Sequence, residues 1–255
     1  MNDSKIKNNH PLQISVPMGL LGDNFSYIEK FGRNRTVASG NEEVIEDSSL
    51  AAQTLSTAAD IDTISSSNAG DGQEIEIQGL DEDWELVTQT ATLNGQTKVT
   101  LDTPLIRVFR AKNIGSSALA GDVYIYVDGD ITAGVPDDDP DVRAKILTAK
   151  NQTNMAKYTI PYGYTGYLVK WYVAMLRTSG TSAVACDVDI YIREYGGAFR
   201  SKQPIGIQNT GNGNWQYEFP FALQVAAKSD IEVRATPTAN ADVSAGFTLL
   251  LIKDE

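Results

Sequence analysis

The sequence predicts an all-β protein: an antiparallel β-sandwich, of jelly-roll type, preceded by an extended N-terminal arm. Two observations indicate this fold class. Apolar residues alternate with polar ones in several short runs, and turn-forming pairs separate the runs. Alternation with a period of two buries one face of a strand and exposes the other, as in antiparallel sheets. After residue 58 no helical pattern of ten or more residues interrupts the runs, which favours two packed sheets.

The predicted strands follow one another at short intervals. Alternating runs lie at 74–78, 122–127, 169–175 and 230–234, and a mostly apolar run at 247–252 closes the chain. Turn signals between the runs are Asn94-Gly95, Asp128-Gly129, Gly196-Gly197 and Asn212-Gly213. Such pairs adopt the backbone conformations that tight turns require.

Residues 1–57 differ from the rest because they lack long alternations and are broken by glycines. We therefore divide the chain into an extended docking arm, 1–57, and a β-sandwich domain, 58–255. The arm is expected to bury its apolar side chains on a partner protein. The predicted partner-docking residues are Leu20, Leu21, Phe25, Tyr27, Ile28 and Phe31.

The sandwich region contains an internal similarity. Residues 115–127 align without gaps with residues 180–192, and each copy follows a strand-like run. This predicts a strand–turn–strand unit at 105–127 that is duplicated at 169–192 and placed twice in the sandwich. The alternative is that turns of glycine, serine and alanine before alternating strands look alike without any duplication.

Composition excludes several classes of function. The net charge of −12 disfavours binding to nucleic acid and to anionic membranes. We expect no membrane span and no secretory signal, because no apolar run of sufficient length exists.

One cysteine and one histidine, Cys186 and His10, exclude a disulfide framework, a zinc site and most nucleophilic centres. Cys186 shares a strand face with Val184 and Val188, which predicts a buried structural thiol. We therefore predict a non-enzymatic protein without a cofactor.

Two binding chemistries remain possible. Aspartates crowd the loop at 128–141, and their oxygen ligands suit calcium; the candidate ligands are Asp128, Asp130, Asp137 and Asp139. The alternative is a solvated acidic loop. Aromatic side chains could stack on sugars, and the candidates are Trp215, Tyr162 and Tyr164. Aromatic residues also fill sandwich cores and oligomer interfaces, which is the alternative for these three. An Asp/Glu pair that cleaves glycans is the third and least supported possibility.

Seven segments occur in a recognisable order. They are FGRN at 31–34, EEVI at 42–45, SSSNAGDG at 65–72, IQGLDEDW at 77–84, TLNG at 92–95, IRVFRA at 106–111 and MAKYTIPYGYTG at 155–166. Their order and spacing resemble a family of tailed-bacteriophage virion structural proteins, over residues 31 to about 235. Members of that family often carry Trp where this chain has Glu46, so the arm contact can differ here.

The resemblance implies a virion component and supplies no catalytic residues. We expect a capsid-associated decoration or cement protein, or a head-fibre base protein, assembled in the bacterial host cytoplasm. Its expected partners are the major capsid protein or other virion proteins and further copies of itself, in a trimer. The alternatives are a tail- or neck-associated module and a host-glycan-binding protein.

Overall fold

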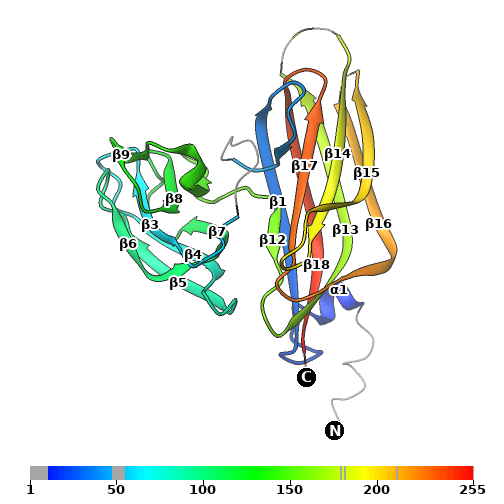
Figure 1. Ribbon diagram of the computed structural model, residues 1–255, viewed down its shortest axis with the longest axis horizontal. Coiled ribbons are helices and arrows are strands. Elements are labelled where there is room, and N and C mark those ends of the chain that lie inside the picture. Colours follow the sequence, from blue (N-terminus) through cyan, green and yellow to red (C-terminus); the bar gives the residue numbers. More distant parts are fainter. Residues whose placement is uncertain (1–10, 48–54, 179, 181, 211, 255) are drawn as a thin grey trace.

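The computed structural model describes residues 11–47, 55–178, 180, 182–210 and 212–254. The chain forms two β-sandwiches side by side (Figure 1). We call one the insert domain, made of β3 to β11, and the other the terminal domain, made of β1, β2 and β12 to β18. The insert domain interrupts the terminal domain between β2 and β12. The antiparallel β-sandwich predicted from the sequence is confirmed, but there are two of them where one was expected.

The terminal domain packs two antiparallel sheets around one core. Their strand orders are β1-β18-β13-β16 and β12-β17-β14-β15, and β2 joins the second sheet beside β17. Trp171 and Phe247 are fully buried between the sheets. The strands are β1 (Phe25–Val37), β2 (Glu43–Val44), β12 (Lys157–Thr159), β13 (Tyr164–Arg177), β14 (Val184–Arg193), β15 (Arg200–Asn209), β16 (Asn212–Val225), β17 (Asp230–Pro237) and β18 (Ala241–Lys253).

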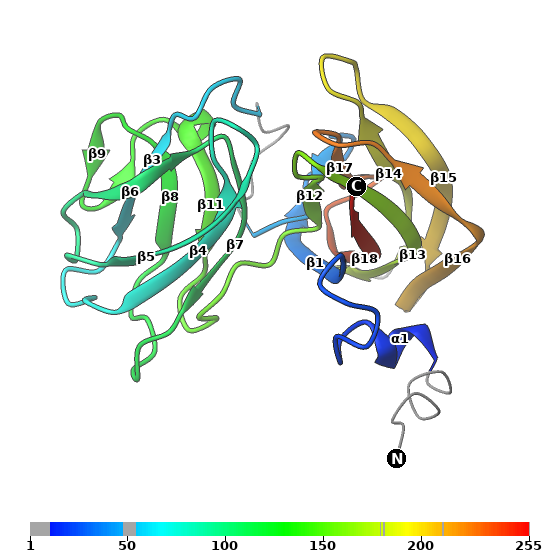
Figure 2. The same ribbon diagram turned by 90° about the horizontal axis from the view of Figure 1, so that it is seen from below.

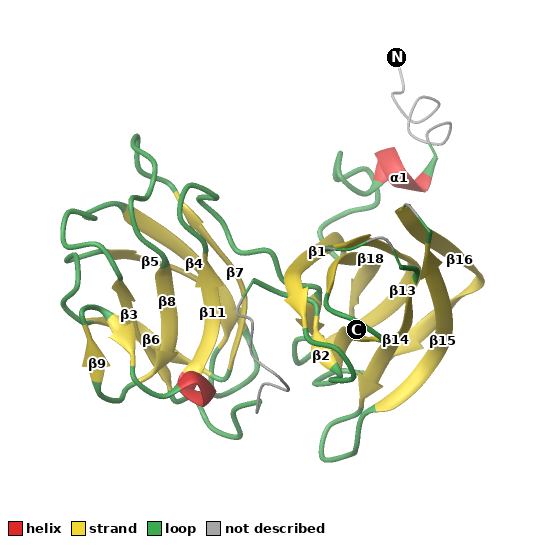
Figure 3. Ribbon diagram, turned by 90° about the horizontal axis from the view of Figure 1, so that it is seen from above, coloured by secondary structure: helices red, strands yellow, loops and turns green. Residues whose placement is uncertain are grey.

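The insert domain has its own core between sheets of order β11-β8-β3-β6 and β5-β4-β7 (Figure 2). Ile64, Ile75, Ile77 and Ile125 are fully buried there. The strands are β3 (Ile61–Ser66), β4 (Glu74–Leu80), β5 (Leu86–Thr92), β6 (Val99–Leu105), β7 (Arg107–Asn113), β8 (Val123–Val127), β9 (Ile131–Thr132), β10 (Val135–Pro136) and β11 (Val142–Ile146). Helical structure in the described residues is limited to α1 (Leu12–Ser15) and the 3-10 helix η2 (Asp139–Asp141), so no described helix has the length to cross a membrane (Figure 3).

The predicted arm is not a single extended segment, because its second half is a strand of the terminal domain. β1 pairs with β18 from Phe25 opposite Ile252 to Asn34 opposite Val243. Sequence patterning misses β1 because its buried positions carry Lys30, Gly32 and Asn34 in place of apolar residues. Gly32 is required by close packing, since a Cβ atom there would lie 2.0 Å from the carbonyl oxygen of Ile45. The boundary at residue 57 is therefore wrong, and the segment that precedes the sheets is residues 11–24.

The two similar segments lie in different domains. β8 of the insert domain and β14 of the terminal domain carry the matching residues. In each domain the preceding strand, β7 or β13, belongs to one sheet and the following strand to the other. Each unit therefore connects the two sheets of its own sandwich. The sequence prediction places both units in one sandwich. A duplication as their origin stays a prediction.

Deletion from the N-terminus tests the revised boundary. Removal of residues 1–24 should leave the fold and its melting temperature nearly unchanged. Removal of residues 1–40 should unfold the terminal domain, because the loss of β1 exposes one edge of β18 and total stabilities are only about 5–15 kcal/mol. Circular dichroism melts of both truncations check this, and equal melting temperatures would contradict it.

Candidate functional site

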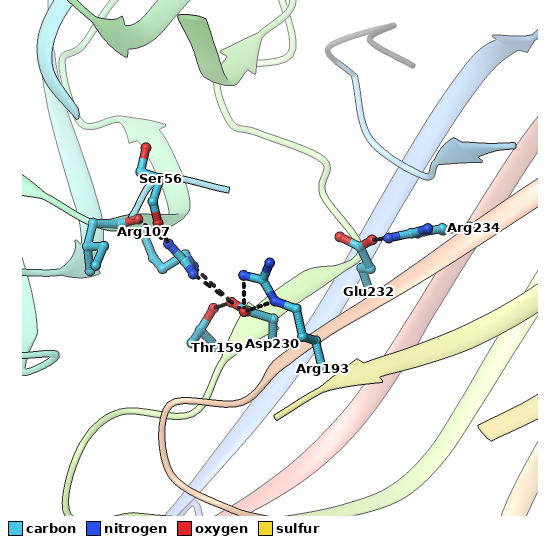
Figure 4. Close-up of polar contacts among 8 residues, drawn as sticks. Ser56, Arg107, Thr159, Arg193, Asp230, Glu232 and Arg234 are labelled. Carbon is cyan, nitrogen blue, oxygen red and sulfur yellow. Dashed lines mark hydrogen bonds and ion pairs between the residues drawn. The ribbon is translucent and has the colours of Figure 1, made fainter. Parts of the chain in front are cut away.

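The two domains meet around the buried carboxylate of Asp230, at the start of β17 (Figure 4). Arg107 of the insert domain donates from Nε to Oδ1 at 2.8 Å. Arg193 of β14 donates from Nη2 to Oδ2 at 2.7 Å and from Nε at 3.0 Å. Thr159 donates its hydroxyl to Oδ1 at 2.6 Å. One carboxylate therefore joins β7 of the insert domain to β12, β14 and β17 of the terminal domain.

Arg107 is held by further acceptors within the insert domain. Its Nη1 donates to the carbonyl oxygens of Ser56, at 2.6 Å, and Ile106, at 2.7 Å. The hydroxyl of Ser56 in turn accepts a hydrogen bond from Nε of Arg143 at 3.1 Å. Buried charges are tolerated when their donors and acceptors are used in this way. The network fixes the point where the chain enters the insert domain.

A second set of charged pairs lies on β17 or beside it, and all members except Glu42 are buried or nearly so. Lys157 pairs with Glu46 at 2.8 Å, and Arg234 pairs with Glu232 and, at 2.7 Å, with Glu42. Burial raises the pKa of the Glu232 carboxyl above its usual range, although Arg234 opposes the shift. Glu232 and Arg234 lie in β17, as Figure 4 shows, while Lys157 lies in β12 and the two remaining glutamates flank β2. We call these pairs, together with Asp230 and its partners Arg107, Arg193 and Thr159, the seam.

Lys30 carries a further perturbed charge from β1 to the insert domain. Its ammonium donates to the carbonyl oxygen of Phe109, in the insert domain. Burial, followed by repulsion from Lys157 and Arg110, lowers the pKa of Lys30 to about 7, while Glu46 acts in the opposite direction. The interface thus contains an amine that titrates near neutral pH.

Aromatic side chains lie around Arg107 at the contact between the two domains. Trp84 has a left-handed backbone (φ 66°), and its ring lies 5.0 Å from the Arg107 guanidinium and 5.3 Å from the Tyr195 ring. The ammonium of Lys228 lies 5.6 Å from the Trp84 ring and 4.9 Å from the Tyr162 ring. Such cation–π contacts contribute about 0.5–2 kcal/mol each, depending on their exposure. Trp84 therefore belongs to the contact between the domains.

An open pocket of about 310 Å³ lies beside this contact. Its lining residues are Ser56, Thr57, Trp84, Arg107, Arg193, Tyr195, Gly196, Gly197 and Asp230. The side chains pair mainly with one another, an arrangement suited to holding two domains together.

Cys186 lies elsewhere, buried in the terminal core as predicted, where burial raises the pKa of its thiol to about 12. His10 lies outside the described residues.

The three predicted sugar-stacking residues do not form one site. Tyr162 is exposed beside Lys228, and Tyr164 begins β13. Trp215 of β16 is paired with Val173, nine residues further along β13, which places it about 30 Å from Tyr164 at a rise of about 3.3 Å per residue. Its ring packs 4.9 Å from that of Trp171 and 5.5 Å from that of Tyr217. Trp215 thus fits the alternative of a core aromatic, and glycan binding stays a prediction.

The four predicted calcium ligands surround the β9–β10 hairpin. Asp128 pairs with Lys98 at 2.8 Å, and the backbone of Asp137 donates to that of Asp130. Asp139 begins η2. Within the described residues, no three Asp, Glu, His or Cys side chains converge on a position that could hold a metal ion. Calcium binding therefore gains no support from the geometry of the loop.

The predicted docking residues are divided by the start of β1. Leu20 and Leu21 precede the strand, and Leu21 is 40% exposed. Phe25, Tyr27, Ile28 and Phe31 belong to β1, and of these Ile28 packs on the terminal core while Tyr27 and Phe31 remain exposed. The docking role of all six stays a prediction.

The residues of the seam were not singled out from the sequence. Asp230 and Glu232 alternate with Ile231 and Val233, a pattern that predicts a solvated polar face, yet both carboxylates are buried. The one available signal is Arg107, a charge within the apolar run at 105–109.

Comparisons with known proteins assign no family. No protein-family model matches the chain, and no curated protein resembles it in sequence. Among solved structures, the VP2 subviral particle of infectious bursal disease virus is 11% identical with a TM-score of 0.23, over 91% of this chain and 77% of that one. The structure of the Gt strain of the same virus is 14% identical with a TM-score of 0.22, over 91% and 73%. TM-scores this low assign neither fold nor function.

Replacement of Asp230 by alanine tests the seam. Because two arginines would lose their buried partner, we expect the free energy of unfolding to fall by about 3–5 kcal/mol. Asp242→Ala is the matched control, since Asp242 pairs with the more exposed Arg33, and its loss should cost about 0–1 kcal/mol. Urea denaturation of both variants measures the difference, and equal losses would contradict the role of Asp230.

The pH dependence of stability tests the burial of Lys30. Between pH 7 and 10.5 the unfolded chain retains the Lys30 proton and the folded chain has lost it, so stability should rise with pH across this window. Other groups titrate at the same time, so the informative quantity is the difference between the parent and Lys30→Met. Chemical denaturation from pH 6.5 to 9.5 should show a steeper rise for the parent. Parallel curves would contradict a lowered pKa of Lys30 in the folded chain.

Proposed function

We propose that the chain is a non-enzymatic structural component of a tailed-phage virion, either a capsid-associated decoration or cement protein or a head-fibre base protein. It acts by packing against other virion proteins and against copies of itself, in a trimer. The observation that carries the proposal is the strand order of the terminal domain, taken together with the sequence resemblance to virion proteins.

The eight strands β1, β2 and β13 to β18 are paired in a nested order. The first pairs with the eighth, the second with the seventh, the third with the sixth and the fourth with the fifth. We interpret this order as a long hairpin wound into a double Greek key, which is the jelly roll. Jelly rolls form viral capsid domains but also lectins and cupins, so the fold alone does not decide the function.

The sequence resemblance to tailed-phage virion proteins favours a virion protein over a lectin or a cupin. Its segments lie in both domains and include Arg107 and Lys157 of the seam and Trp84 beside Arg107. The resemblance thus covers the residues that join the two sandwiches, as well as single turns and strands.

The segment at 11–24 supports packing against a partner. It precedes β1 and projects beyond the terminal domain (Figure 3). Ile14, Met18 and Leu21 are 44%, 60% and 40% exposed. Exposed apolar side chains clustered in one segment are typical of surfaces that become buried in an assembly. We assign capsid docking to this shorter arm.

A host-glycan-binding module of the tail or neck is the second candidate. The open pocket beside Asp230 supports it, because its volume of about 310 Å³ suits one or two sugar rings and Tyr195 is exposed at its edge. Hundreds of copies per particle would favour decoration of the shell, and six or twelve would favour the tail or neck.

Substitutions in the short arm test the proposal. Ile14→Asp with Met18→Asp should lower the number of copies in purified particles at least about tenfold, because charged residues cannot be buried on an apolar partner surface. Ile114→Asp is the matched control, since Ile114 is 43% exposed in the insert domain. Quantitative mass spectrometry of particles measures the copies, and normal incorporation of the double variant would contradict docking through this arm.

A further inference from the structure

A groove of about 380 Å³ separates the lower half of β1 from the insert domain. Five consecutive residues of β1, Ser26 to Lys30, line one wall. The other wall includes Thr88, Gln78 and Arg110, which are paired in a row across β5, β4 and β7. Figure 1 shows these strands facing each other across the junction of the domains.

The groove runs along an open edge of a sheet. Successive side chains of a strand point to opposite faces, so five consecutive residues can line one groove only along the strand edge. β1 is the outermost strand of its sheet and pairs with β18 alone. On its other side, the described residues first form a bridge at Phe31, opposite Met155. Phe25 donates its backbone N–H to Gly22, and the backbone groups of Ser26 to Lys30 on this side form no β-bridge within the described residues, so they are open to another strand.

The other outer strand of the same sheet is protected against such pairing. In β16 the register shifts after Leu223, opposite Leu168, and Pro220 lies within the shifted stretch. Shifts and prolines are the common devices that block edge-to-edge pairing. β1 contains no proline, and its register with β18 is regular from Phe25 to Asn34. β1 therefore lacks these two devices from Phe25 to Asn34.

The groove combines apolar flanks with charged side chains of both signs. Leu86 is 50% exposed and Tyr27 is 44% exposed. Arg110 donates from Nη2 to Gln152 at 3.0 Å, whereas its Nε is buried and has no acceptor in the described part of the chain. The carboxylate of Glu29 is engaged by the Tyr27 hydroxyl at 2.7 Å. Lys30 donates to the carbonyl oxygen of Phe109, so Arg110 is the positive group of the groove that retains an unused donor in the described part of the chain.

We propose that the β1 edge binds an extended segment of another polypeptide as an added strand, with an acidic side chain of that segment directed at Arg110. Main-chain hydrogen bonds supply affinity in this mode, and side-chain contacts such as those with Leu86 supply specificity. The inference rests on the proposed function for the identity of the partner, a second virion protein. The strand addition itself follows from the edge and the groove.

The test uses the full chain and three fluorescein-labelled peptides measured by fluorescence anisotropy. The parent peptide is acetyl-Ser-Thr-Val-Glu-Val-Thr-Ser-amide, the second replaces Glu by Lys, and the third is N-methylated at alternate residues. We expect the lysine peptide to bind about tenfold or more weakly, because the charge contact becomes repulsive. The N-methylated peptide should not bind, because it lacks the main-chain donors.

Two protein variants test whether the peptide binds in the groove. Leu86→Asp should weaken binding of the parent peptide about tenfold, and Leu176→Asp should not. Leu176 is the matched control because it is 44% exposed on β13, away from the groove. Equal binding of the parent and N-methylated peptides, equal effects of the two variants, or no binding of the parent peptide would each overturn the proposal.

Particle assays separate this inference from the proposed function. If the protein is absent from particles but the peptides behave as expected, strand addition stands and the virion role fails. If the protein is present in particles and the peptides do not bind, the reverse holds.

Discussion

The carboxylate of Asp230 is the contact on which the two-domain arrangement depends. It lies at the start of β17 and accepts hydrogen bonds from Arg107 of the insert domain and from Arg193 and Thr159 of the terminal domain. A buried carboxylate shared by two arginines is stable only while all three groups stay in place, since removal of one leaves an uncompensated charge. The interaction therefore fixes the orientation of one sandwich on the other more strictly than apolar contact would.

Apolar packing works together with this polar seam. Leu80, Ile106 and Phe109 of the insert domain belong to the same core cluster as the terminal strands. The insert domain is held at both of its ends, by Ser56 against Arg107 and Arg143 and by Lys157, whose ammonium donates to the carbonyl oxygen of Arg143 at 3.2 Å. The insertion thus extends the terminal sandwich sideways and creates the groove along β1. A surface formed by two domains requires that the domains do not move independently.

The sequence predicts the fold class because the alternation is clear wherever buried positions carry apolar residues and exposed positions carry polar ones. β8, β13, β14 and β18 follow that rule. β1 does not, since its buried positions carry Lys30, Gly32 and Asn34. Lys30 donates to the carbonyl oxygen of Phe109 in the insert domain, Gly32 packs against the backbone of Ile45, and Asn34 donates to Glu43. For the same reason the domain boundary, the insertion and the seam could not be predicted: the partners of Asp230 are 37 to 123 residues away in the chain. A charge in a strand looks solvated until its partner is known.

The central claim is that the seam makes the two sandwiches one cooperative unit. Differential scanning calorimetry of the full chain measures this most directly. The account predicts a single transition whose calorimetric and van't Hoff enthalpies agree, as for one two-state unit. Two resolved transitions, with one sandwich melting while the other stays folded, would contradict it.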